Sequence, residues 1–189
     1  MATDPELTLV LGGARAGKSA YAEQLAAGYG PRVCYVATAE TRDDEMRARA
    51  AAHRARRPAG WTTLEVAAGV GAALLSGPVS ADAILVDCLT LLVSNIVLAQ
   101  PVLDADVVSG EVDRQVSAAV VTEVEALLQA ERQLGLPMVV VSNEVGMGLV
   151  PPYPAGRLYR DALGRANQRV AAAASRVVLL VAGLPITLK

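Results

Sequence analysis

The chain alternates between short apolar runs and longer stretches in which apolar residues recur at helical spacing. Five runs rich in valine, leucine and isoleucine are continuous rather than alternating with polar residues, which is typical of strands buried on both faces of a sheet. These runs are LTLVLG (7–12), RVCYVAT (32–38), DAILVD (82–87), PMVVVSN (137–143) and RVVLLVAG (176–183). The pattern therefore predicts a mostly parallel sheet.

Stretches of helical spacing lie between these runs. The predicted helices cover residues 18–28, about 42–56, roughly 111–134 and 157–174. In the longest of them a valine or leucine stands at every fourth position from Val112 to Leu128, which predicts one buried face. The alternation of strands and helices predicts an α/β fold with helices on both faces of the sheet.

Connections and chain length bear on domain organisation. Residues 58–62 and 99–110 are predicted to be the long connections, and the three prolines of LVPPYPAGR (149–157) are expected to exclude a regular helix there. The sequence has no internal repeat and no low-complexity linker, so residues 1–189 are expected to form a single domain. With no phenylalanine and 3% aromatic residues, its core should be aliphatic.

Charge and cysteine usage narrow the class of protein. The formal net charge is −2, so no overall positive field favours a nucleic acid partner. No segment approaches the roughly 20 unbroken apolar residues of a membrane span, and the first residues lack a signal-peptide pattern. Cys34 and Cys88 lie in or beside apolar runs and are expected to be buried free thiols in a reducing compartment. These features predict a cytoplasmic protein.

The first predicted strand leads into GGARAGKS (12–19), which matches the phosphate-loop pattern G-x-x-x-x-G-K-[ST]. Because a strand precedes this loop and a helix follows it, backbone N–H groups and the helix N-terminus are expected to point at one anion. Lys18 is predicted to contact the β- and γ-phosphates and to act in catalysis, and the Ser19 hydroxyl is predicted to ligate Mg²⁺. Arg15 adds a further cation within the loop.

A second candidate metal ligand follows another apolar run. In AILVDCLT, four apolar residues end in Asp87, which places a carboxylate at the carboxyl end of a buried strand. An aspartate in this position is, taken alone, more often a helix cap or a turn residue. Together with the phosphate loop, Asp87 is predicted to be the second Mg²⁺ ligand.

The only histidine, His53, lies in a predicted basic helix, TRDDEMRARAAAHRARRP (41–58). Acidic residues begin this helix and arginines end it, as the helix dipole favours, so His53 can be interpreted as a solvated polar residue. It also shares a helix face with Arg49, Arg56 and Arg57, whose charges disfavour protonation of the imidazole and favour an anionic ligand. A neutral imidazole in such a patch is suited to attack a nucleotide's α-phosphate. Spacing alone leaves both interpretations open.

Segments along nearly the whole chain resemble, in order and spacing, those of the bifunctional adenosylcobinamide kinase / adenosylcobinamide-phosphate guanylyltransferase family of cobalamin biosynthesis. They are GGARAGKS (12–19), YVATAE (35–40), DDEM (43–46), HRARRPAGW (53–61), TLE (63–65), DCLTLLVSN (87–95), VSNEVGMGLVP (141–151) and RLYRDALGRANQRVA (157–171). With the phosphate loop, the resemblance implies a P-loop NTPase-like fold.

The resemblance implies a bifunctional enzyme with a corrinoid substrate. Such an enzyme phosphorylates adenosylcobinamide with a nucleoside triphosphate, GTP or ATP. It then transfers GMP from GTP to adenosylcobinamide phosphate through a covalent GMP–histidine intermediate, which here falls on His53, and releases pyrophosphate. The resemblance also implies Mg²⁺ as a cofactor and a homo-oligomer such as a trimer.

The resemblance further assigns GTP binding to the phosphate loop, to the end of the second strand, to the arginine-rich segment and to two acidic residues. These positions are Gly12, Gly13, Ala14, Arg15, Ala16, Gly17, Lys18, Ser19, Ala37, Thr38, Ala39, Arg54, Ala55, Arg56, Arg57, Glu65 and Asp87. Because the guanine-reading pattern N-K-x-D is absent from the sequence, the preference for GTP rests on the resemblance.

Residues 142–168 supply candidates for corrinoid contact or subunit packing. They are Asn143, Glu144, Arg157, Tyr159, Arg160, Asp161, Asn167 and Gln168. About half of them are expected to be capping and surface residues instead.

Two other functions fit the same motifs. One is a nucleotide-binding regulatory switch, in which the basic helix docks a protein partner. The other is a small-molecule kinase without a covalent step, in which the arginines form a lid over the phosphates. Transfer of GMP to His53 would separate the bifunctional enzyme from both.

Overall fold

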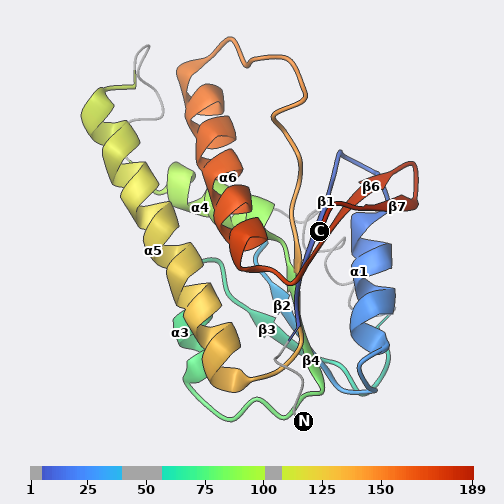
Figure 1. Ribbon diagram of the computed structural model, residues 1–189. Coiled ribbons are helices and arrows are strands. Elements are labelled where there is room, and N and C mark those ends of the chain that lie inside the picture. The colour runs from blue at the N-terminus through green and yellow to red at the C-terminus, as the bar shows by residue number, and fades with distance from the viewer. Residues whose placement is uncertain (1–5, 40–56, 101–107) are drawn as a thin grey trace.

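A computed structural model describes residues 6–39, 57–100 and 108–189, so the helix predicted at about 42–56 lies outside the described residues. Within these ranges a seven-stranded sheet has the order β3-β2-β4-β5-β1-β6-β7 (Figure 1). Neighbouring strands pair in parallel except β6 and β7, which form an antiparallel hairpin. The strands are β1 (Leu7–Gly12), β2 (Val33–Ala37), β3 (Thr62–Glu65), β4 (Ala83–Asp87), β5 (Met138–Val141), β6 (Arg176–Val181) and β7 (Leu184–Thr187). The predicted, mostly parallel sheet is confirmed.

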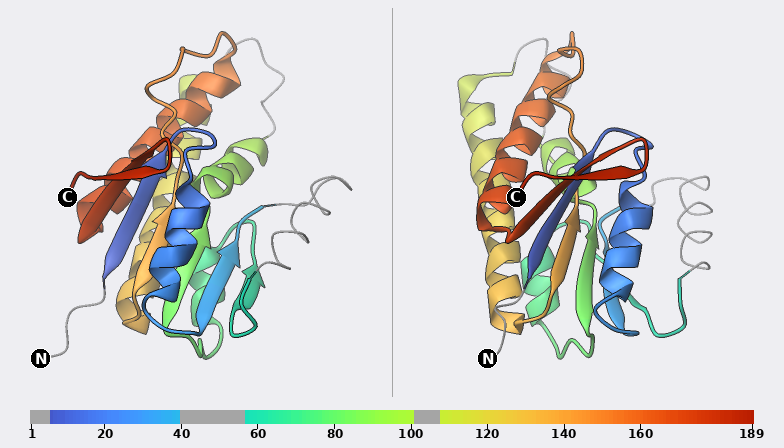
Figure 2. Two further views of the ribbon diagram at one scale, coloured as in Figure 1. Left: turned by 90° about the vertical axis from the view of Figure 1, so that its right-hand side faces the viewer. Right: turned by 45° about the vertical axis from the view of Figure 1, so that its right-hand side comes forward.

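Helices cover both faces of this sheet, as Figures 1 and 2 show. Of the described helices, α1 (Lys18–Ala27) packs on one face, where it contacts Val10 and Leu85 in one apolar layer. The opposite face carries the other layer and four helices. These are α3 (Val70–Leu75), α4 (Leu89–Leu98), α5 (Gly110–Leu134) and α6 (Pro154–Ala173). Because successive strand residues enter opposite layers, the central strands read as continuous apolar runs.

The longest helix, α5, follows its predicted pattern. The Ser109 hydroxyl caps its first turn by accepting a hydrogen bond of 3.3 Å from the backbone N–H of Val112, and Gly135 ends it with a φ of 62°. The four residues at the following predicted positions, Val116, Val120, Val124 and Leu128, are all buried. None of the helices in the described ranges is both long and apolar enough to span a bilayer.

Four described elements are not among those that the sequence predicts, namely β3, β7, α3 and α4. The two strands have four residues each and lie at the edges of the sheet, where partial exposure interrupts the apolar pattern. Helix α3 has six residues, too few to show a helical period. Helix α4 reads LTLLVSNIVL, which is apolar around most of its circumference because it is packed beneath α5 and α6.

The expectation that prolines exclude a helix from residues 149–157 is wrong for the end of that stretch. Helix α6 begins at Pro154, not at the predicted residue 157. A proline in the first turn removes an N–H that has no partner within the helix, so it costs the helix no hydrogen bond. Pro151 and Pro152 do lie outside the helix.

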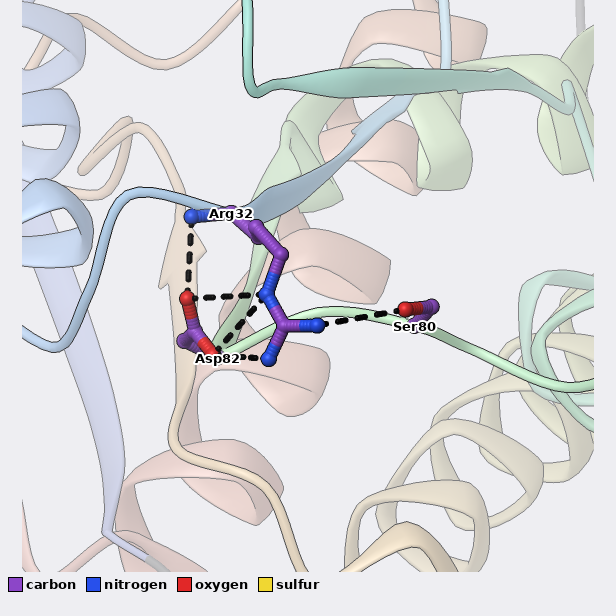
Figure 3. Close-up of polar contacts among 3 residues, drawn as sticks. All are labelled: Arg32, Ser80 and Asp82. Atoms are coloured by element: carbon purple, nitrogen blue, oxygen red, sulfur yellow. Dashed lines mark hydrogen bonds and ion pairs between the residues drawn. The ribbon is translucent and has the colours of Figure 1, made fainter.

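At the amino ends of the strands, Arg32 and Asp82 join the turns that precede β2 and β4 (Figure 3). Asp82 accepts hydrogen bonds from the backbone N–H of Arg32, at 3.0 Å, and from its guanidinium, which lowers the pKa of the Asp82 carboxyl. The guanidinium also donates to the Ser80 hydroxyl at 3.4 Å. The pair supports the parallel register of β2 and β4 at the end of the sheet away from the phosphate loop.

Gly71 in α3 lies directly against the backbone of α5. A Cβ atom added there would lie 2.3 Å from the carbonyl oxygen of Ala126. The clash is with helix backbone, which cannot move away by rotating as a side chain can. Gly71→Ala should therefore lower the free energy of unfolding by about 1–3 kcal/mol. Denaturant unfolding measures this change. Gly77→Ala is the matched control, since a Cβ atom there meets nothing within 4 Å, and it should stay within about 0.5 kcal/mol. Equal losses in both variants would contradict this account.

Candidate active site

The parallel strands bring the predicted site segments to one edge of the sheet. Strand β1 runs into the phosphate loop, while β2 ends at Ala37, β3 at Glu65 and β4 at Asp87. In the sheet register Ala37 lies opposite both Glu65 and Asp87. Ligands of open α/β sheets bind outside the carboxyl ends of the strands, so this edge is the candidate active site.

The phosphate loop, Gly12–Ser19, turns sharply between β1 and α1. Gly12 has a φ of 154° and Gly17 a φ of 94°, and a Cβ atom at Gly12 would lie 2.6 Å from the carbonyl oxygen of Leu180. Glycine is therefore required at Gly12 by both conformation and close packing. Residues 15–20 line a cleft of about 270 Å³ at the N-terminus of α1, and helix N-termini are favourable positions for anions such as phosphate.

Two backbone hydrogen bonds hold this loop from either side. The N–H of Gly183, in the turn between β6 and β7, donates to the carbonyl oxygen of Ala16 at 3.0 Å. The N–H of Glu144, after β5, donates to the carbonyl oxygen of Gly12 at 3.1 Å. The loop is thus anchored to both neighbouring strands of β1 and is preorganised before any ligand enters.

Lys18 is the first residue of α1, and its side chain folds back over the loop. Its Nζ donates to the carbonyl oxygen of Gly13 at 2.7 Å, and the residue is only 9% exposed. Burial lowers the pKa of Lys18, while the nearby Cys88 and Asp87 side chains act in the opposite direction. The interaction with Asp87 places a cation and a carboxylate within electrostatic reach of each other beside the loop.

Asp87 and Ser19 are the described residues that could hold a magnesium ion. Asp87 ends β4 and Ser19 lies in the first turn of α1, and both offer the hard oxygen ligands that Mg²⁺ prefers. Among the described residues no three side chains of His, Cys, Asp or Glu gather as a metal site.

The segment after β2 is fixed by side-chain bonds beneath the site. The buried Thr38 hydroxyl donates to the carbonyl oxygen of Cys88 at 2.7 Å and accepts from the N–H of Cys88 at 2.8 Å. The Asn95 side chain in α4 donates to the carbonyl oxygens of Thr38 and Ala67, both at 2.9 Å. The ends of β2, β3 and β4 are therefore held together, and Ala39 follows Thr38 at the same edge.

Both cysteines are free thiols, as expected. Cys34 is buried and Cys88 is partly buried. Burial raises the pKa of Cys34, and burial together with the charge of Asp87 raises the pKa of Cys88 to about 11. Both thiols are therefore neutral near pH 7 and are not suited to act as nucleophiles.

Arg57 lies at the start of a described range, whereas His53, Arg54, Ala55 and Arg56 lie outside the described residues. The Cζ atom of Arg57 lies 3.3 Å from the centroid of the Tyr35 ring, and its Nη1 donates to the Thr63 hydroxyl at 2.9 Å. Its Nε is buried without a hydrogen-bond partner. Arg57 thus lies over the middle of β2 and β3, where it lines a cleft with Glu23 and Gln24 of α1.

Tyr35 is not among the residues predicted from the sequence, yet it contacts two of them. Its hydroxyl donates to Oδ2 of Asp87 at 2.8 Å, and its ring lies beneath Arg57. Burial raises the pKa of Tyr35 above its usual range, and Asp87 raises it further, so the hydroxyl remains a donor at working pH. The available signal was a tyrosine inside an apolar strand, because a buried hydroxyl requires a partner.

A second polar cluster supports the other side of the loop. The Ser142 hydroxyl donates to Oδ1 of Asn167 at 2.6 Å, and Nδ2 of Asn167 donates to the carbonyl oxygen of Asn143 at 3.0 Å. The N–H of Asn143 donates to the Thr90 hydroxyl at 2.7 Å. Asn143 and Asn167, predicted for corrinoid contact or subunit packing, therefore tie β5 to α4 and α6.

Other candidates from residues 142–168 are placed differently. A cleft of about 360 Å³ is lined by several of these candidates, namely Glu144, Arg160, Asp161 and Gln168, together with Asn167. The Arg157 side chain donates to the carbonyl oxygens of Pro151 and Pro152, so it supports the turn before α6. Tyr159 is packed against the core on the α4 side. Within the cleft, Glu144 accepts a hydrogen bond from the N–H of Gly146 at 2.6 Å and Arg160 donates one to the Gly146 carbonyl oxygen at 2.7 Å.

Comparison with known proteins identifies close relatives over almost the full length. The sequence profile of the family described as "Cobinamide kinase / cobinamide phosphate guanyltransferase" matches residues 8–188. The "Bifunctional adenosylcobalamin biosynthesis protein CobP" of Pseudomonas aeruginosa is 44% identical over 181 residues, which cover 96% of each chain. The proteins named "Bifunctional adenosylcobalamin biosynthesis protein CobU" of Salmonella typhimurium and Escherichia coli are 39% and 38% identical, covering 97% of this chain and 99% of theirs.

Among solved structures, the RadB recombinase matches with a TM-score of 0.49 and 15% identity, over 93% of this chain and 74% of that one. The family relationship itself comes from the sequence relatives, and it confirms the resemblance carried by the phosphate loop and the segments that follow. Because the family profile and the relatives cover nearly the whole chain, the protein belongs to the cobinamide kinase / cobinamide phosphate guanyltransferase family.

Proposed function

We propose that this chain carries out both reactions of its family at the carboxyl edge of one sheet, and that His53 carries GMP in the second reaction. The family is one of bifunctional transferases of cobalamin biosynthesis. The observation that carries the proposal is the chain of contacts from the phosphate loop to Arg57. Lys18 interacts electrostatically with Asp87, Asp87 accepts a hydrogen bond from the Tyr35 hydroxyl, and the Tyr35 ring lies against Arg57. Arg57 follows His53 by four residues in the sequence.

The phosphate loop supports the kinase reaction. Its backbone N–H groups and the Lys18 ammonium bind the triphosphate, and Lys18 exchanges its bond to Gly13 for phosphate oxygens. Mg²⁺, held by Ser19 and Asp87, supplies charge neutralisation on the phosphate oxygens. The hydroxyl of the cobinamide side chain attacks the γ-phosphorus of GTP or ATP, and the nucleoside diphosphate leaves.

The arginine-rich segment supports the second reaction. A neutral His53 nitrogen forms a bond to the α-phosphorus of GTP while the bond to pyrophosphate breaks. A phosphate oxygen of the phosphorylated corrinoid then displaces the histidine and forms the nucleoside diphosphate linkage. Arg54, Arg56 and Arg57 favour the neutral imidazole before attack and bind phosphate oxygens during it.

The remaining nucleotide contacts are proposed from position at the edge. Ala37 and Glu65 end β2 and β3, and Thr38 and Ala39 follow Ala37, so their position at the carboxyl edge supports a role in binding GTP. The corrinoid is proposed as substrate because the family acts on cobinamide. A homo-oligomer such as a trimer and a cytoplasmic location remain predictions.

Replacing the proposed nucleophile tests the covalent step. His53→Ala should abolish attachment of GMP after incubation with GTP and Mg²⁺, because no other histidine exists in the chain. Intact-protein mass spectrometry, with and without acid treatment, measures the acid-labile adduct. The kinase reaction of the same variant is the internal control and should remain measurable. A GMP adduct on the alanine variant would rule out His53, and an unmodified wild-type chain would rule out the covalent mechanism.

Replacing the phosphate-loop lysine tests whether one loop serves both reactions. Lys18→Ala should lower the rates of phosphoryl and guanylyl transfer by about a hundredfold or more, because both require the triphosphate in the loop. Lys189→Ala is the matched control: it removes the chain's only other lysine, which bonds to carbonyl oxygens of α6. It should retain both activities in steady-state assays. Full retention of either reaction in Lys18→Ala would require a second nucleotide site.

A further inference from the structure

We infer that Tyr35 is a positioning residue for both reactions, because its hydroxyl orients the Asp87 carboxylate while its ring holds the guanidinium of Arg57. This inference rests on the proposed function and assigns a role to a residue that contacts neither of the reacting phosphorus atoms. It makes one side chain the link between Asp87, the proposed magnesium ligand, and Arg57.

The hydroxyl contact is a short bond in a buried setting. Tyr35 is 4% exposed in the central part of β2, and its hydroxyl lies 2.8 Å from Oδ2 of Asp87 on the neighbouring strand β4. A carboxylate at a strand end can rotate, but rotation of Asp87 would break this bond and leave a buried hydroxyl without its partner. Hydrogen bonds of this kind fix the orientation of metal-binding carboxylates. The hydroxyl therefore fixes the orientation of the carboxylate that would hold Mg²⁺.

The ring contact uses a different part of the same side chain. Arg57 lies over the ring face at 3.3 Å, which is the geometry of a cation–π interaction. Its second contact is the Thr63 hydroxyl, and Thr63 is the register partner of Tyr35 on β3. A single cross-strand pair thus supplies both contacts to the guanidinium. The centroid of the Trp61 ring lies 6.4 Å from that of the Tyr35 ring.

The two contacts can be separated by substitution. Phenylalanine keeps the ring below Arg57 and removes the bond to Asp87, whereas leucine removes both. A residue that merely filled the core would affect both reactions through stability alone. If Tyr35 is a positioning residue, loss of its hydroxyl should weaken Mg²⁺ binding, and loss of its ring should slow the attachment of GMP to His53.

The hydroxyl is tested by Tyr35→Phe. We expect the dissociation constant of Mg²⁺, titrated by calorimetry into protein bound to a non-hydrolysable GTP analogue, to rise about tenfold. Tyr29→Phe is the matched control, since Tyr29 also donates to a carboxylate, Oε2 of Glu6, at 2.8 Å and lies far from the site. It should leave Mg²⁺ affinity unchanged. Fluorescence of Trp61, the only tryptophan, checks that the site retains its packing in both variants.

The ring is tested by comparing Tyr35→Leu with Tyr35→Phe at saturating Mg²⁺. The initial rate of GMP attachment to His53 should fall at least about tenfold further in the leucine variant, while the kinase kcat stays within about twofold. Thr63→Val provides a second variant if the leucine variant does not fold, because it removes the Thr63 hydroxyl bond to Arg57 and keeps Tyr35 intact. It should slow GMP attachment and spare the kinase reaction.

The outcomes distinguish this inference from the proposed function. If the wild-type chain forms no GMP adduct, the proposed covalent step is wrong, and the Mg²⁺ titration still tests the hydroxyl. If the wild-type chain is labelled but Tyr35→Phe binds Mg²⁺ as tightly as Tyr29→Phe, the hydroxyl has no positioning role. Equal losses of both reactions in Tyr35→Leu and in Thr63→Val would overturn the assignment of the ring.

Discussion

Parallel pairing of strands that are buried on both faces constrains everything else in this structure. The four central strands β2, β4, β5 and β1 pair in parallel, so each chain crossing must return over a face of the sheet and every carboxyl end emerges at one edge. The phosphate loop and the ends of β2, β3 and β4 consequently meet, although long stretches of sequence separate them. The parallel direction of the strands therefore determines which segments form the candidate site.

Buried polar contacts then hold that edge in one arrangement. Thr38 and Asn95 fix the ends of β2, β3 and β4 on one side of the loop, and Ser142 and Asn167 fix β5 on the other. Each of these groups is hydrogen-bonded, so burial does not leave it without a partner. With a net charge of only −2 for the whole chain, the proposed attraction for phosphate has to come from local groups such as the loop N–H dipoles and Lys18. Rigid local dipoles suit a site that must bind charged phosphates in a defined geometry.

The elements that sequence could predict are those with strong local patterns. The central strands show as apolar runs, α5 shows through its four-residue repeat, and the phosphate loop shows through its glycines and lysine. Four elements lack such patterns, namely the edge strands β3 and β7, the short α3 and the nearly all-apolar α4. Their apolar and polar positions depend on how they pack against neighbouring elements, which the local sequence does not show. Pro154 shows the same limit, since a proline reads as a helix breaker until the helix is known to start there.

The sequence by itself determined the glycine-rich loop between β1 and α1 and the family, because both depend on residues that follow one another in a fixed order along the chain. The loop from Gly12 to Ser19 is a local turn, because β1 ends at Gly12 and α1 begins at Lys18. Only the tertiary structure decided which side chain supports Asp87 and Arg57. Tyr35 and Asp87 are 52 positions apart, and their hydrogen bond exists because two strands pair in one register. Contacts of that kind are set by the geometry of the sheet, which no local pattern of residues records.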